Sequence, residues 1–163
     1  MAHQSSRPAK RNDRRRSIVV GTDGSPTAVQ AVQRAAALAR SGGATLHLVT
    51  AYNPVPDRTD AAELEALPEA LRWMGSPGQA AEDLLSDATA LLDEEGIEVE
   101  RHARPGDPVE VLLEVADEVE ADLLVVGNKG MQGAKRFVVP SVPNRVSHHA
   151  ACDVLIVNTT GRP

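Results

Sequence analysis

Cysteine and aromatic residues are scarce in this chain of 163 residues, and each shortage excludes a class of protein. With one cysteine, Cys152, no disulfide can form within the chain, which fits a reducing compartment and predicts a cytoplasmic location. Aromatic side chains make up only 2% of the residues, so the stacking platforms of single-strand nucleic-acid binders are not expected. The core must therefore consist of valine, leucine, isoleucine and alanine, which suits parallel strands covered by helices.

Long apolar runs are missing as well. No run of about 18 apolar residues occurs, so the sequence predicts no membrane span. The N-terminus is basic but has no apolar segment behind it, which argues against a secretory signal.

The charge is unevenly distributed along the chain. The net charge is −6, yet residues 1–17 hold six basic side chains and one acidic side chain, which leaves −11 on the remainder. An acidic body disfavours contact with the nucleic-acid backbone, so no specific nucleic-acid partner is expected. We predict that residues 1–16 form a disordered basic tail before a single domain over residues 17–160. The alternative is that the tail touches a nucleic acid or an acidic partner.

Short apolar runs alternate with helical patterns. Strands are predicted at residues 17–21, 45–52, 97–103, 122–127 and 153–158. Helices are predicted from Ser25–Pro26 to Gly42–Gly43, within 61–74, over 79–95, from Asp107–Pro108 onward, and over 141–150. This alternation predicts an α/β fold with a single doubly wound, mostly parallel, five-stranded sheet and helices on both faces, in the Rossmann-like manner.

Two of the predicted strands end in glycine and continue into polar loops, Gly21-Thr22-Asp23 and Gly127-Asn128. In open parallel sheets, ligands bind beyond the carboxyl ends of the strands where the strand order reverses. Glycine lets the backbone approach a phosphate closely, and a helix start near Ser141 would add free N–H groups. These features predict phosphate capture by residues 127–142, with a plain turn and helix cap as the alternative.

The motifs resemble those of the universal stress protein family. They are IVVGTDGS at 18–25, ADLLVVGNKG at 121–130, SVPNRV at 141–146 and CDVLIV at 152–157, in the order that the family has them. The resemblance covers residues 17–159. It implies a stress-response regulatory protein that binds ATP or a related adenine nucleotide, with or without Mg²⁺. It also implies a homodimer formed through the last strand, Val154–Val157.

The resemblance further implies roles for individual residues. Asp23 would lie near the ribose or a bound Mg²⁺, and Ala51 beside the adenine. The phosphates would be contacted by the loop and helix start after the fourth strand. The complete implied set is Thr22, Asp23, Ala51, Gly127, Asn128, Gly130, Ser141 and Val142.

One position departs from the family pattern. The family has a third glycine immediately before the serine, where this chain has Pro140. Proline has no N–H and a fixed φ, so one phosphate donor is lost. Two alternatives to ATP binding follow: the pocket prefers fewer phosphates, or it is empty and the protein is a dimeric interaction module. A weak Mg²⁺-dependent nucleotide hydrolase is a third alternative, although no nucleophile–base pair is recognisable and we expect no enzyme.

The histidines and the segment between the second strand and the next long helix carry weaker predictions. His148 and His149 could form a metal site with Cys152, but adjacent histidines on a helix point about 100° apart, so they are expected to lie on a surface helix without a metal. His47 and His102 are expected to be packed or edge residues of strands. The irregular stretch 53–78, which includes Trp73, is expected near the pocket mouth or at a partner surface.

Overall fold

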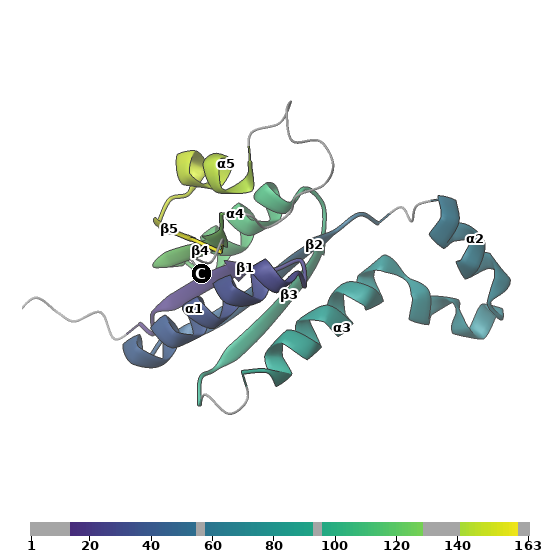
Figure 1. Cartoon of the computed structure of the whole chain (residues 1–163), viewed down its shortest axis with the longest axis horizontal. Coiled ribbons are helices and arrows are strands. Elements are labelled where there is room, and N and C mark those ends of the chain that lie inside the picture. Colours follow the sequence, from purple (N-terminus) through teal and green to yellow (C-terminus); the bar gives the residue numbers. More distant parts are fainter. Residues whose placement is uncertain (1–13, 55–57, 93–95, 129–140, 160–163) are drawn as a thin grey trace, which may run out of the picture.

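The computed structural model describes residues 14–54, 58–92, 96–128 and 141–159 (Figure 1). The strands are β1 (Ser17–Gly21), β2 (Thr45–Tyr52), β3 (Val99–Pro105), β4 (Leu123–Gly127) and β5 (Asp153–Val157). The helices are α1 (Pro26–Gly42), α2 (Arg58–Ala66), α3 (Pro77–Ala90), α4 (Pro108–Glu118) and α5 (Val142–His149), with a 3₁₀ helix, η1 (Glu69–Gly75).

The strands form one sheet in the order β3-β2-β1-β4-β5, and every pairing is parallel. The predicted doubly wound sheet is thereby confirmed. The chain moves outward from β1 through β2 to β3, and then crosses to the other side of β1 to form β4. The strand order therefore reverses between β1 and β4, where the expected binding crevice should lie.

Helices cover both faces of the sheet, as predicted (Figure 1). Alternate residues of β1 serve the two faces. Val20 packs in a core with α1 and α3, whereas Val19 packs in a second core with α4 and α5. The face under α1 relies on small residues, which let the helix approach the sheet closely; the fully buried ones are Ala31, Ala35, Ala36 and Ala39.

The predicted start and stop of α1 are both present. The Ser25 hydroxyl accepts a hydrogen bond from the Ala28 N–H at 3.2 Å, and Pro26 occupies the first turn, where its missing N–H costs nothing. Gly43 follows the helix with a φ of 62°, a left-handed conformation that glycine adopts readily. These ends are fixed by neighbours in sequence, which is why they could be predicted.

The segment between β2 and α3 differs from the prediction. The single helix expected within 61–74 is instead α2 followed by η1, with a break at Leu67–Pro68. Pro68 has no N–H to continue the helix and disfavours helical backbone at the residue before it. The following helix, α3, was expected over 79–95. It begins slightly earlier, at Pro77, and ends earlier, at Ala90. The prediction for Trp73 concerns a side chain outside the described part.

The N-terminal residues that are described contact the body of the domain. The Arg14 guanidinium forms ion pairs with Glu120 at 2.5 Å and with Asp122 at 3.5 Å, and Arg15 pairs with Glu98. Residues 1–13 lie outside the described part, so a disordered tail stays a prediction. Among the described helices, none has both the length and the apolar character needed to cross a bilayer.

Candidate functional site

A pocket lies beyond the carboxyl ends of β1 and β4. Five elements surround it: these two strands, the starts of α1 and α5, and the first half of α4. Its described lining is Gly21, Thr22, Asp23, Ala28, Leu112, Val126, Gly127 and Val142. Four residues predicted for nucleotide binding, at positions 22, 23, 127 and 142, are therefore brought together although 120 positions separate the first from the last.

The loop after β1 is held in one shape by short-range hydrogen bonds. Buried Thr22 donates its N–H to the Val49 carbonyl at 2.9 Å, which keeps it beside β2. The Thr22 hydroxyl accepts the Gly24 N–H at 3.2 Å, and the Asp23 Oδ1 accepts the Ser25 N–H at 2.9 Å. Gly24 has a φ of +77°, which suits glycine and lets the chain turn directly into α1. The turn leaves the Asp23 carboxylate exposed at the pocket.

Gly127 and Asn128, two predicted site residues at the end of β4, have different surroundings. Gly127 lines the pocket, where the lack of a side chain allows close approach of a ligand. Asn128 is outside the described lining, and its Oδ1 accepts hydrogen bonds from the N–H and the hydroxyl of Thr159, both at 2.8 Å. Its Nδ2 donates to Asn158 Oδ1 at 3.2 Å. Asn128 therefore connects the end of β4 by hydrogen bonds to the residues that follow β5.

The start of α5 supplies few backbone donors. Val142 lines the pocket, and exposed Ser141 has the extended backbone of an N-cap, although within the described residues its side chain makes no capping hydrogen bond. Pro143, in the first turn, has no N–H. The Arg145 N–H donates to the Ser141 carbonyl at 3.0 Å. Val142 and Asn144 are left as the donors of this turn that could face an anion.

An ion pair that the sequence analysis missed positions α5. Arg145 Nη1 lies 3.3 Å from both carboxylate oxygens of Asp107. Asp107 is also the N-cap of α4, because its Oδ1 accepts the N–H groups of Val109 and Glu110 at 3.0 and 3.2 Å. One carboxylate thus joins the starts of the two helices that border the pocket. The cap was recognisable in the sequence, whereas the pairing across 38 positions was not.

The remaining predicted residues lie beside the pocket or outside the described part. Half-buried Ala51 packs against the core under α4 and lies two residues beyond Val49, the register partner of Gly21. It is therefore level with Asp23 across the β1–β2 pair, but it is not in the described lining of the pocket. Gly130 and Pro140 belong to residues 129–140, which the structure does not describe.

A second hollow starts at the same loop but has a different character. Its volume is about 580 Å³, and it runs between α1 and α3 from Thr22 and Asp23 to Leu91 and Leu92. The charged side chains on its described wall are Asp23, Asp83 and Asp87, all acidic. Carboxylates repel anions, so this wall is poorly suited to a ligand that carries phosphate.

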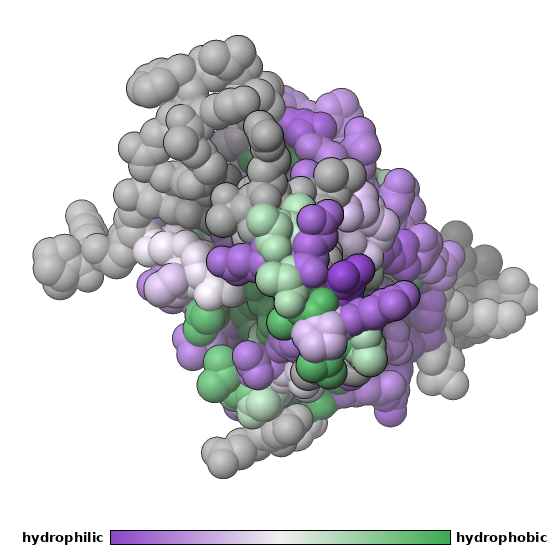
Figure 2. Space-filling model, turned by 90° about the vertical axis from the view of Figure 1, so that its right-hand side faces the viewer, coloured by the Kyte–Doolittle hydropathy of each residue, from purple (hydrophilic) through white to green (hydrophobic). Residues whose placement is uncertain are grey.

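Apolar side chains are exposed at two places that could meet a partner. Figure 2 views the side of the molecule that holds α2 and η1, and it shows apolar surface near the middle of that face. Leu67 and Leu71 of this segment are among the exposed large apolar residues. The other place is β5, which is an edge strand of the sheet and on which Ile156 is 45% exposed.

The histidines that lie together in the structure, His47 and His102, are far apart in the sequence. His148 and His149 are exposed on α5, and within the described residues they form no cluster of potential metal ligands with Cys152. Burial and the nearby carboxylates of Asp153 and Asp117 raise the pKa of the Cys152 thiol, so the thiol stays protonated at neutral pH.

The one group of three potential metal ligands among the described residues is formed by His47, Glu100 and His102.

Comparison with known proteins gives one consistent family. The sequence profile of the universal stress protein family matches residues 14–158. Universal stress protein Rv1636 of Mycobacterium tuberculosis (strain ATCC 25618 / H37Rv) is 40% identical over 147 residues, which cover 89% of this chain and 97% of the relative.

Solved structures show the same fold. A universal stress protein crystallised in complex with cAMP is 35% identical, with a TM-score of 0.66 and coverage of 89% of this chain and 98% of that one. The universal stress protein from Archaeoglobus fulgidus in complex with dAMP is 25% identical, with a TM-score of 0.61 and coverage of 86% and 96%.

Proposed function

Since the chain belongs to the universal stress protein family, we propose that it binds an adenine nucleotide in the pocket between β1 and β4 and acts as a stress-response regulator without enzymatic activity. The observation that carries the proposal is the convergence of Thr22, Asp23, Gly127 and Val142 on one pocket at the point where the strand order reverses. The cAMP and dAMP complexes of similar proteins support adenine as the base.

The proposal gives each predicted residue a role. The exposed Asp23 carboxylate, oriented by the Ser25 N–H, accepts hydrogen bonds from ribose hydroxyls or binds a Mg²⁺ that accompanies the ligand. Ala51 offers a small apolar surface to the adenine. Gly130, Ser141 and the Val142 N–H contact the phosphates at the start of α5, where the helix dipole favours negative charge.

The preferred ligand carries one phosphate rather than three. Pro140 and Pro143 both lack an N–H in the region that would hold a phosphate chain. Each missing donor costs a longer phosphate chain more than a short one, because the outer phosphates stay unpaired. We therefore place AMP and cyclic AMP ahead of ATP–Mg²⁺ as ligands, in keeping with the single-phosphate ligands of the similar structures.

Calorimetric titration of the full chain with AMP, cyclic AMP and ATP–Mg²⁺ tests this proposal. The Asp23→Asn variant is expected to bind AMP about tenfold more weakly, because a charged acceptor for the ribose is replaced by a neutral one. Asparagine keeps the side-chain oxygen that accepts the Ser25 N–H, so the turn into α1 should survive.

The matched control is Asp83→Asn, because Asp83 lines the second hollow and is absent from the described lining of the pocket between β1 and β4. It should leave the affinity for AMP unchanged. Because Asp23 lines both hollows, the Asp83 variant decides between them: if Asp83→Asn weakens AMP binding, the ligand sits between α1 and α3 and the proposed site is wrong. If none of the three nucleotides binds, the nucleotide proposal fails for this chain. Release of phosphate from ATP–Mg²⁺ that stops in Asp23→Asn would instead favour a weak hydrolase.

A second function, dimeric interaction, is favoured by the exposed edge of the sheet. An edge strand offers unpaired backbone groups, and β5 also exposes Ile156. We propose that two copies pair through Val154–Val157. Sedimentation equilibrium of the full chain should give a dimer, and Ile156→Lys should give a monomer, because lysine on an edge strand blocks pairing.

The control for this experiment is Leu91→Lys, which places the same charge on an exposed leucine of the α3 end. It should leave the dimer intact. A monomeric parent, or a dimer that persists in Ile156→Lys, would remove β5 as the interface.

A further inference from the structure

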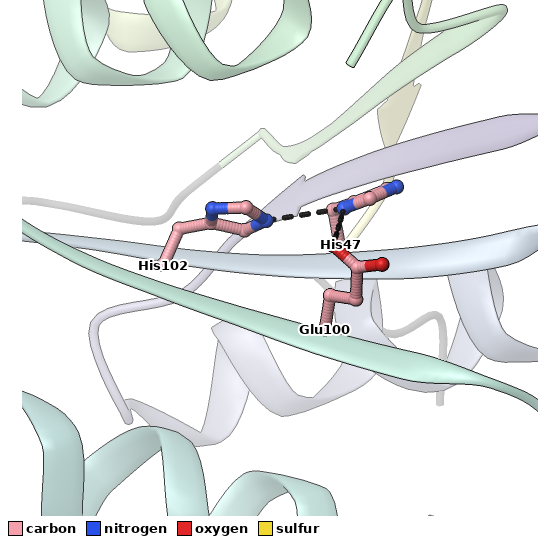
Figure 3. A group of neighbouring side chains, drawn as sticks. All are labelled: His47, Glu100 and His102. Atoms are coloured by element: carbon pink, nitrogen blue, oxygen red, sulfur yellow. Dashed lines mark hydrogen bonds and ion pairs between the residues drawn. The ribbon is translucent and has the colours of Figure 1, made fainter. Parts of the chain in front are cut away.

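Three side chains that could bind a metal converge on the β2–β3 pair (Figure 3). In the parallel register His47 lies opposite Glu100, and Val49 lies opposite His102. Residues in register, and residues two apart on one strand, share a face of the sheet. Val49 packs in the core beneath α4, so all three side chains stand on the α4 side.

The distances between the ligand atoms match those around a tetrahedral metal ion. His47 Nδ1 lies 3.1 Å from His102 Nε2 and 3.4 Å from Glu100 Oε2, and all three ligand atoms lie within 4.8 Å of one another. Zinc binds imidazole nitrogen and carboxylate oxygen at about 2.0–2.2 Å, so neighbouring ligand atoms in a tetrahedron are about 3.3 Å apart. Two of the three separations therefore need almost no adjustment.

His47 Nδ1 lies within hydrogen-bonding distance of two groups, His102 Nε2 and Glu100 Oε2. A neutral His47 ring carries one proton, and if it sits on Nδ1 it can be donated fully to only one of the two acceptors, Glu100 or His102. If His102 donates to His47 instead, the Glu100 carboxylate faces a nitrogen lone pair. A divalent cation between the three atoms would use a lone pair from each of them.

The protonation and charge of the surroundings suit a cation. Burial disfavours a positive charge on either ring and lowers the pKa of both His47 and His102. The Arg104 side chain also lowers the pKa of His102, but both of its terminal nitrogens donate to the Glu118 carboxylate at 2.6 Å. That ion pair reduces the repulsion that Arg104 would exert on a metal.

We propose that His47, His102 and Glu100 form a Zn²⁺ site with three protein ligands and a fourth position open to water. The site lies on the edge strand β3, and the Glu100 side chain is 53% exposed, so an ion can enter from solvent. His47 precedes Ala51 by four residues of β2, a separation of about 13 Å, which makes the site distinct from the proposed nucleotide pocket. A bound ion would fasten β3 to β2.

The test uses the full chain with its other histidines removed. The substitutions His3→Gln, His148→Gln and His149→Gln leave His47 and His102 as the only histidines of the five in the sequence. After treatment with a chelator and dialysis, calorimetric titration with Zn²⁺ should give one ion per chain. Co²⁺ should give the strong visible absorption of a tetrahedral complex, and Zn²⁺ should raise the melting temperature.

Removing a ligand should weaken the site without unfolding the protein. In that background, Glu100→Gln and His102→Gln should each lower the affinity for Zn²⁺ at least about tenfold, because outer-sphere partners alone are worth that much. The control is Glu98→Gln, at a residue that is similarly exposed and two positions away, which should bind Zn²⁺ as before. The proposal is overturned if the background variant takes up no Zn²⁺, or if Glu100→Gln and His102→Gln both bind it unchanged.

Discussion

Replacing Leu112 with alanine is expected to lower the free energy of unfolding by about 2–5 kcal/mol, among the largest effects that a single substitution should have in this chain. Leu112 is 1% exposed and packs in the core between the sheet and α4. Its methyl groups also lie 3.1–3.2 Å from the point where a side chain on Gly21 would begin, so they form the floor of the pocket. Truncation therefore removes apolar contacts and leaves a cavity beneath the candidate site.

Urea denaturation followed by circular dichroism measures the effect, and the matched control is Leu91→Ala. Leu91 is 68% exposed, so the same substitution there should change the free energy of unfolding by no more than about 0.5 kcal/mol. A 163-residue domain should also melt about 2–4 °C lower for each kcal/mol lost. A cost below about 1 kcal/mol for Leu112→Ala would mean that α4 does not pack on the sheet as described.

The second large effect is expected at Pro140. Pro140→Gly should tighten ATP binding by roughly 10- to 150-fold, since a hydrogen bond to a charged oxygen is worth about 1.5–3 kcal/mol. Glycine restores the missing N–H and permits a positive φ, both of which proline forbids. The gain should be smaller for AMP, because AMP has no outer phosphates to use the restored donor. Calorimetric titration of both variants with both ligands measures the difference.

Pro140→Ala separates the two effects of proline. Alanine restores the N–H but disfavours positive φ, so an affinity equal to that of the glycine variant would show that the donor alone matters. An affinity equal to that of the parent would show that the backbone conformation decides. If neither variant binds ATP more tightly than the parent, the phosphates do not contact this position.

The helices and strands were largely predictable because their signals are local. The apolar run of β1 and the alanine spacing of α1 each follow from the period of the element itself. The caps at Ser25 and Asp107 depend on residues two or three positions away. The break at Pro68 was missed although its cause is also local, because the leucine spacing of the segment suggested one continuous helix.

The candidate site was predictable only in part. Thr22 and Asp23 follow one strand and Gly127 ends another, and the general rule for parallel sheets placed such ends together. The contacts of Asn128 with the end of β5, and of Arg145 with Asp107, have no sequence signal, because each joins residues 30 or more positions apart. Ala51 was assigned from alignment of the strand, and its contact with a ligand stays a prediction.

The clearest contrast is between the fold class and the histidine cluster. By itself, the sequence determined an acidic α/β domain with parallel strands, glycine-ended loops and a proline in place of a glycine, because composition and short periodicities suffice for these features. Only the tertiary structure decided that His47 faces Glu100 and His102. Strand register and the choice of face depend on which distant strands pair, and a shift of one residue would turn His102 to the opposite side of the sheet.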